Sequence, residues 1–123
     1  MKHRILLVED DVMVGPVIKE MLNHGGYDVV LTRDLADTMR LPDFDFSAVI
    51  SDLKLIASDG CEVIAFMRSK KPGIPALLMS GFGPHVANSC AQRGIPDVGF
   101  LPKPFSPPTL LTAAAALVAK TGP

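Results

Sequence analysis

The N-terminus of the sequence lacks a long hydrophobic run. Its first eleven residues, MKHRILLVEDD, hold only four consecutive apolar residues before the acidic residues begin. A signal-peptide core has about 7–15 apolar residues and a transmembrane helix about 20, so this segment fits neither. We therefore expect a cytoplasmic protein with no membrane partner.

An excess of positive charge and closely spaced cysteines are also lacking. The formal net charge is −1, without the basic footprint that is typical of a nucleic-acid-binding domain, so we expect no nucleic-acid partner. The only two cysteines, Cys61 and Cys90, lie far apart and have no metal-ligand spacing. We predict free thiols, buried or half-exposed in a reducing compartment, in preference to a disulfide.

Repeats, low-complexity tracts and linkers are absent as well. The 123 residues are 48% hydrophobic and 20% charged, which is typical of one globular domain with a single core. We therefore expect a single domain over residues 1–123 with no output domain.

Five short apolar runs predict β-strands, and a segment with helical spacing or capping residues follows each run. The first run is wholly apolar, which is typical of a strand buried on both faces of a parallel sheet. The runs lie at residues 5–8, 29–31, 48–50, 76–79 and 98–101.

The expected helices lie between and after these runs. Asp34 and Ser106 are the expected N-caps of the second and the last helix. Strict alternation predicts a (βα)5 fold, in which a doubly wound, five-stranded parallel sheet of order 2-1-3-4-5 has helices on both faces, as in flavodoxin-like proteins. The helices are expected at residues 14–22, 35–41, around 63–67, at 84–94 and at 107–120.

Polar residues follow the strands at one edge of this sheet. Ligands of open parallel sheets bind beyond the carboxyl ends of the strands, where the strand order reverses. The first and third strands are neighbours there, so we expect Glu9, Asp10 and Asp52 to converge, with Ser80 and Lys103 beside them.

Three carboxylates packed together favour a bound cation, because they do not all ionise readily without one. Carboxylate, carbonyl and water oxygens suit a hard divalent ion such as Mg²⁺. Asp11, the next acid along the chain, is expected instead to cap the first helix.

The same cluster predicts phosphoryl chemistry. An aspartate carboxylate can act as a nucleophile and form an aspartyl phosphate. Mg²⁺ and the Lys103 ammonium would neutralise charge on the phosphoryl oxygens, and the Ser80 hydroxyl would donate a hydrogen bond to one of them.

In this combination the residues resemble those of a response-regulator receiver domain of two-component signalling, in the CheY-like superfamily, over essentially the whole chain. The shared features are an acidic pair after the first strand, an aspartate after the third, a hydroxyl after the fourth, and an aromatic residue before a Lys-Pro-Phe sequence. They correspond to Glu9 and Asp10, Asp52, Ser80, Phe100 and residues 103–105. Gly60 stands where the family's loop glycine is expected.

The resemblance implies a role for each residue. Asp52 would accept a phosphoryl group from a phosphohistidine on a sensor histidine kinase or a histidine phosphotransfer protein. Mg²⁺ would be held by Asp10, Asp52, the backbone carbonyl of Lys54 and, through water, Glu9. Lys103 would contact the phosphoryl group, and its bond to Pro104 is expected to be cis.

The resemblance also implies a conformational switch. Ser80 would move toward the phosphoryl group while Phe100 turns inward, which would shift the surface of residues 84–94, 98–101 and 107–120. A homodimer through this surface is a further expectation. Such a protein is not an enzyme, apart from catalysing its own phosphorylation and dephosphorylation.

Several interpretations stay open. The leading one is a stand-alone receiver that signals through protein contacts or passes the phosphoryl group on, and a receiver segment of a hybrid histidine kinase fits as well. An aspartyl-phosphate phosphatase is the alternative from another class, but such enzymes typically have a second acid where Lys54 stands. A pseudo-receiver that only binds partners is disfavoured by the complete set of acids, hydroxyl and lysine.

Overall fold

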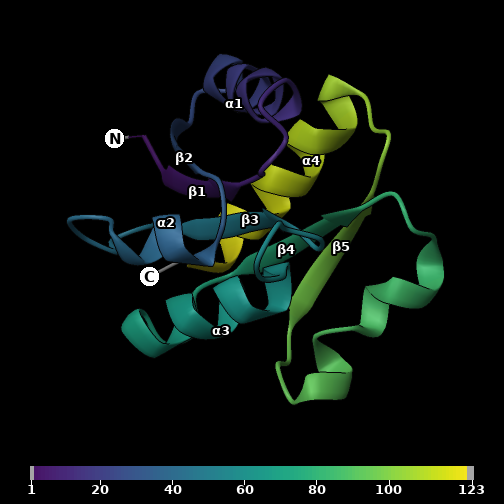
Figure 1. Cartoon of the computed structure of the whole chain (residues 1–123). Helices are drawn as coiled ribbons and strands as arrows, with labels where there is room; N and C mark the ends of the chain where they lie inside the picture. The colour runs from purple at the N-terminus through teal and green to yellow at the C-terminus, as the bar shows by residue number, and fades with distance from the viewer. Residues whose placement is uncertain (1, 122–123) are drawn as a thin grey trace.

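The protein folds around one parallel sheet of five strands, seen in the computed structural model, which describes residues 2–121 (Figure 1). The strand order is β2-β1-β3-β4-β5, and every neighbouring pair is parallel. The predicted number of strands and their predicted order are therefore confirmed. The strands are β1 (Arg4–Val8), β2 (Asp28–Thr32), β3 (Ala48–Asp52), β4 (Ala76–Ser80) and β5 (Val98–Pro102).

Helices cover both faces of the sheet, as predicted. In Figure 1, α1 and α4 lie on one face, and α2 and α3 lie on the other. Alternate residues of β1 enter different hydrophobic clusters, because successive side chains of a strand point to opposite faces. The helices are α1 (Val14–His24), α2 (Leu35–Met39), α3 (Gly60–Lys70) and α4 (Pro107–Val118), and η3 (Ala119–Thr121) is a 3-10 turn after α4.

Side-chain oxygens cap the starts of three of these helices. Asp34 accepts a hydrogen bond from the Asp37 N–H, and Ser106 accepts one from the Thr109 N–H, so both predicted N-caps are confirmed. Asp59 does the same for α3 by accepting from the Glu62 N–H. Each cap satisfies a backbone donor that the helix itself leaves without a partner.

The helix predicted over residues 84–94 is wrong. The segment forms two 3-10 turns, η1 (Pro84–Asn88) and η2 (Ala91–Arg93), between glycines of positive φ at positions 83 and 94. One reason lies in Ser89, whose backbone N–H and hydroxyl both donate to the Val86 carbonyl, at 3.0 and 2.7 Å. That carbonyl is thereby engaged by a three-residue turn, and the chain does not continue as an α-helix.

The prediction of free thiols is also wrong, although the predicted burial is right. Cys61 in the first turn of α3 and Cys90, just before η2, form a disulfide, with their Cα atoms 5.3 Å apart. The two side chains are 0% and 1% exposed. A sequence separation of 29 residues does not reveal such a pair, because only the packing of the segment after β4 against α3 brings the sulfur atoms together.

Helices long and apolar enough to cross a lipid bilayer are absent from residues 2–121.

Candidate functional site

The structure brings the three predicted carboxylates together at the carboxyl edge of the sheet. Glu9 and Asp10 directly follow β1, and Asp52 is the last residue of the neighbouring strand β3. Carboxylate oxygens of the three residues all lie within 4.8 Å of one another. The convergence expected from strand order is therefore found.

Lys103 completes this cluster from the far end of the chain. Its Nζ atom lies 2.5 Å from Glu9 Oε1 and 3.5 Å from Asp52 Oδ1. Its backbone N–H donates to the Ser80 carbonyl at 2.8 Å, which ties the loop after β5 to the end of β4. The Lys103–Pro104 peptide bond is cis, as predicted. One ammonium group thus faces two of the three acids.

The cluster is partly withdrawn from water, which changes the acidity of its members. Glu9 is 2% exposed, and the side chains of Asp52 and Lys103 are 16% and 24% exposed. Burial and the charge of Glu9 raise the pKa of Asp52 to about 6, although Lys103 opposes this. Burial, followed by the charge of Glu9, also raises the pKa of Asp10. The carboxylates therefore repel one another without a cation.

The same carboxylates also shift the pKa of Lys103, in the direction that favours its charged form. Burial lowers the pKa of this ammonium group, but the hydrogen bond to Glu9 and the charges of Asp52 and Glu9 outweigh that effect and raise it. Lys103 therefore remains a cation inside the acidic crevice.

Asp11 does not belong to the cluster. Its Oδ1 atom accepts hydrogen bonds from the N–H groups of Met13 and Val14, at 2.8 and 3.1 Å, and these bonds lower the pKa of its carboxyl group. Met13 is the N-cap of α1 and Val14 its first residue, so Asp11 binds the first N–H groups of the helix from just before it, although it is not itself the N-cap.

Ser80 and Phe100, the two predicted switch residues, lie on the neighbouring strands β4 and β5. Ser80 is buried, and its hydroxyl oxygen accepts a hydrogen bond from the Phe82 N–H at 3.1 Å. Phe100 is half-buried, lies opposite Leu78 in the sheet and packs against the core on the α3 side. In the sequence, Ser80 precedes the segment that carries η1 and η2, and Phe100 follows it.

The loop that carries Lys54 is closed by backbone hydrogen bonds. The Gly60 N–H donates to the Leu53 carbonyl at 2.8 Å, and the Leu55 N–H donates to the Ser58 carbonyl at 3.2 Å. A side chain at position 60 would place its Cβ atom 2.5 Å from the Asp52 carbonyl oxygen. This explains the glycine expected there, since α3 can start this close to the end of β3 only without a Cβ atom.

Two features beside the crevice were not predicted from the sequence. The Lys54 ammonium lies 4.9 Å from the centre of the Phe82 ring, which links the loops after β3 and β4 by a cation–π contact. An apolar groove of about 620 Å³ lies next to Lys103, between α1 and residues 103–105. Exposed Met13 and Val17 on the α1 side were the available signal for this groove, since they extend the helix's apolar stripe.

The donor set of the crevice fits Mg²⁺. Carboxylate and carbonyl oxygens are the ligands that this ion prefers, and the raised pKa values of Asp10 and Asp52 report the charge that a cation would balance. Asp10 and Asp52 contribute carboxylate oxygens to this cluster, and Glu9 is already engaged by Lys103.

Comparison with known protein sequences identifies relatives of this chain. Residues 5–115 match the family model of the response regulator receiver domain. Response regulator MprA of Mycobacterium sp. (strain KMS) is 33% identical over 133 aligned positions, which cover 100% of this chain and 54% of that protein. Transcriptional regulatory protein FixJ of Bradyrhizobium diazoefficiens is 27% identical over 123 residues, with 99% and 60% covered. The chain spans about half the length of these curated relatives.

Comparison of folds leads to the same group of proteins. The non-phosphorylated HemR receiver domain from Leptospira biflexa superposes with a TM-score of 0.83 and 28% identity, over 99% of this chain and 98% of that one. A response regulator receiver protein from Sinorhizobium medicae WSM419 superposes with a TM-score of 0.82 and 25% identity, over 98% and 97%.

Proposed function

Because the chain belongs to the response regulator receiver domain family, we propose that it accepts a phosphoryl group on Asp52 from a phosphohistidine of a partner protein. The family identity makes it a signalling domain of two-component systems. The identity of the acceptor, the use of Mg²⁺ and the partner are parts of the proposal. The observation that carries it is the cluster of Glu9, Asp10 and Asp52 with Lys103.

Asp52 has the setting that a nucleophilic carboxylate requires. It ends a buried strand, so its backbone is held rigidly, while its side chain keeps 16% exposure at the mouth of the crevice. Phosphoryl transfer depends mainly on positioning the reacting atoms and on balancing the charge of the phosphoryl oxygens. The Lys103 ammonium, 3.5 Å from Asp52 Oδ1, would bind one of those oxygens.

The proposal includes Mg²⁺ held by Asp10, Asp52 and the Lys54 carbonyl, with Glu9 reached through water. When bound, the ion supplies positive charge that offsets the carboxylates and the phosphoryl oxygens. Ser80 supplies a hydroxyl that would leave the Phe82 N–H and donate to a phosphoryl oxygen. Phe100 would then turn inward, and this movement is the proposed signal.

We propose a sensor histidine kinase or a histidine phosphotransfer protein as the phosphodonor. The apolar groove between α1 and residues 103–105 supports this, because it opens beside Lys103 and would accept an apolar helix face bearing the phosphohistidine. A homodimer through the η1–η2, β5 and α4 surface, signalling through protein contacts alone, and a cytoplasmic location stay predictions.

Phosphorylation of the purified chain tests the proposal. Incubation with acetyl phosphate and Mg²⁺ should give a single phosphoryl adduct by intact-mass measurement, stable in acid and labile in base. Asp52→Asn should abolish it, whereas the matched control Asp11→Asn should keep it, because Asp11 binds the first N–H groups of α1 outside the crevice. An adduct that persists in Asp52→Asn would overturn the assignment.

The phosphatase alternative predicts a different result. Continuous release of phosphate from unrelated phosphoesters, at many turnovers per protein, would favour an aspartyl-phosphate phosphatase over a receiver that modifies only itself. Lys54, two residues after Asp52, argues against this alternative because it replaces the second acid of such enzymes. A receiver segment of a hybrid kinase would behave as proposed in this assay.

A further inference from the structure

The segment between β4 and β5 is tied covalently to the start of α3. We call residues 84–93, which contain η1 and η2, the clasped segment. Its Cys90 is bonded to Cys61 in the first turn of α3, and both cysteines are buried. No role of Asp52, Lys103 or the metal ligands requires this bond, so it calls for an explanation of its own.

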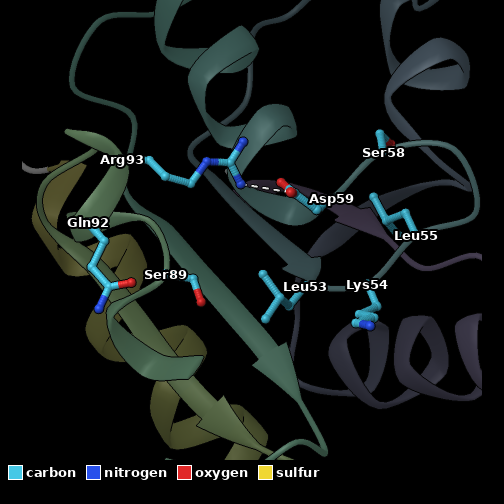
Figure 2. Close-up of a pocket in the computed structure, with 8 residues that line it drawn as sticks. All are labelled: Leu53, Lys54, Leu55, Ser58, Asp59, Ser89, Gln92 and Arg93. Carbon is cyan, nitrogen blue, oxygen red and sulfur yellow. Dashed lines mark hydrogen bonds and ion pairs between the residues drawn. The ribbon is translucent and has the colours of Figure 1, made fainter. Parts of the chain in front are cut away.

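An ion pair joins the same two parts of the molecule. Arg93 in η2 donates to Asp59 Oδ2 at 2.7 Å, while Asp59 Oδ1 caps α3 (Figure 2). A pocket of about 460 Å³ lies between residues 53–59 and residues 89–93, which form its two walls. Because the ion pair is partly exposed, it contributes little to keeping the two segments together. The disulfide is therefore the stronger connection between the walls.

The clasped segment has little internal structure of its own. Its turns are closed by backbone hydrogen bonds that span three residues, such as Ser89 N–H to the Val86 carbonyl and Arg93 N–H to the Cys90 carbonyl. Short 3-10 turns have poorer hydrogen-bond geometry than an α-helix and rarely persist alone. Besides Val86, which packs against the core, the segment is held mainly by its connections to α3.

The other end of the disulfide reaches the acceptor strand. Cys61 follows Gly60, whose N–H donates to the Leu53 carbonyl and whose lack of a Cβ atom leaves room for the Asp52 carbonyl. The clasped segment, in turn, lies between Ser80 on β4 and Phe100 on β5. One covalent bond therefore links the start of α3, close to the end of β3, to the segment between the two proposed switch residues.

We propose that the Cys61–Cys90 disulfide is a redox-sensitive clasp: oxidised, it holds residues 84–93 against α3, and reduced, it releases them. Reduction requires a dithiol. One of its thiolates attacks a cysteine sulfur and breaks the S–S bond, and its second thiolate resolves the mixed disulfide. Two electrons and two protons pass to the protein, the dithiol becomes a disulfide, and oxidation by a disulfide is the reverse.

Because both cysteines are buried, the rate at which the disulfide is reduced depends on movement of residues 84–93. A dithiol reaches Cys61 or Cys90 only when the clasped segment lifts from α3, so the rate of reduction measures that opening.

A consequence for signalling rests on the proposed function. If the change at Ser80 and Phe100 moves the segment between them, the clasp opposes the phosphorylated conformation. Because such coupling is reciprocal, binding of a phosphoryl mimic must then shift the protein from the disulfide form toward the dithiol form.

Hydrogen exchange of the wild-type protein tests the clasp itself. Oxidised and dithiothreitol-reduced samples should differ in mass by two hydrogen atoms. Backbone amides of residues 85–95 should exchange about tenfold faster after reduction, while those of α1 should not change. Equal exchange in the two forms would overturn the proposal, and so would a failure of the disulfide to form in any glutathione buffer.

Two variants separate the clasp from other effects. Cys61→Ala/Cys90→Ala should exchange like reduced wild type and should not respond to dithiothreitol. Arg93→Gln keeps the disulfide and loses the ion pair, so it should stay close to oxidised wild type. A response to dithiothreitol in the double variant would overturn the assignment to these cysteines.

A second measurement tests the coupling to the acceptor site. In a glutathione buffer that leaves about half the protein oxidised, Mg²⁺ with beryllofluoride should shift the dithiol-to-disulfide ratio about fivefold toward the dithiol. An unchanged ratio despite bound beryllofluoride overturns the coupling. No binding of beryllofluoride in either form would instead count against the proposed function, while hydrogen exchange still decides the clasp.

Discussion

The acidic crevice and the clasped segment differ in what holds them in place. The crevice residues follow directly from β1 and β3 at the centre of the sheet, and their backbones stay in position although Glu9, Asp10 and Asp52 repel one another. The clasped segment leads from β4 to the edge strand β5, consists of short turns, and is tied by one disulfide and one ion pair. A site in the middle of a sheet can therefore tolerate electrostatic strain, whereas a peripheral segment needs a cross-link to keep one position.

Removal of the disulfide should produce the largest effect on stability. A bond that closes a loop of this length stabilises a domain by about 3.5 kcal/mol, because it restricts the unfolded chain. Cys61→Ala/Cys90→Ala and reduced wild type should each lose about this amount in urea unfolding, compared with oxidised wild type. A loss below about 1 kcal/mol would contradict this estimate of the contribution of the disulfide.

Gly60→Ala should disturb the point where the two regions meet. Its Cβ atom would lie 2.5 Å from the Asp52 carbonyl oxygen and 2.6 Å from a Leu78 methyl group. We expect a loss of about 2 kcal/mol in urea unfolding, together with weaker phosphorylation from acetyl phosphate.

Gly81→Ala is the matched control for Gly60→Ala. A Cβ atom at position 81 has no described neighbour within 4 Å, and this glycine has no positive φ. The control should change stability by less than about 0.5 kcal/mol. Equal losses in the two variants would show that close packing at residue 60 is not the cause.

Replacing Asp52 by a neutral residue should stabilise the metal-free protein, whereas removal of the disulfide should destabilise it. The folded pKa of about 6 lies above the ordinary value of 3.8, so the folded state binds more protons than the unfolded state between these values. Stability contributed by this group is therefore present below pH ~4 and is lost as the pH rises through ~6. Above that window, Asp52→Asn should exceed wild type by about 3 kcal/mol.

Urea unfolding in the presence of a chelator, at about pH 4 and about pH 7.5, measures this difference. The advantage of Asp52→Asn should nearly vanish at the lower pH, because protonated aspartic acid carries no charge there. If the stability difference between Asp52→Asn and wild type did not depend on pH, the gain in stability would not come from the titration of Asp52. Asp11→Asn should have the opposite sign at neutral pH, since it removes the charge of a carboxylate whose pKa is lowered by the N–H groups of Met13 and Val14.

Arg93→Gln should have the smallest effect. The ion pair with Asp59 is partly exposed, and such pairs contribute about 0.5 kcal/mol. The loss should shrink further at high salt, as measured by urea unfolding in buffers of different ionic strength. A loss as large as that of the double cysteine variant would make the ion pair an equal partner of the disulfide.

Residues with a local signal were predicted well. The apolar runs located all five strands, and Asp34 and Ser106 cap the helices that their positions indicated. The three consecutive acids were also separated correctly, since Glu9 and Asp10 lie in the crevice while Asp11 binds the first N–H groups of α1. These outcomes depend on strand ends and helix starts, which are properties of neighbouring residues.

The errors share a different cause. Residues 84–94 carry an acceptable helical pattern, yet Ser89 and the flanking glycines favour 3-10 turns once Cys90 is anchored to α3. The disulfide and the pairing of Arg93 with Asp59 join residues about thirty positions apart. Neither has a signal in the local sequence.

By itself the sequence determined the alternation of strands and helices, the sheet they build and the acids at its carboxyl edge, because hydrophobic periodicity and capping act between near neighbours. Only the tertiary structure decided which cysteines pair, why position 60 excludes a side chain, and how residues 84–93 are held. Those features depend on distances between segments that the chain brings together only after the sheet has formed.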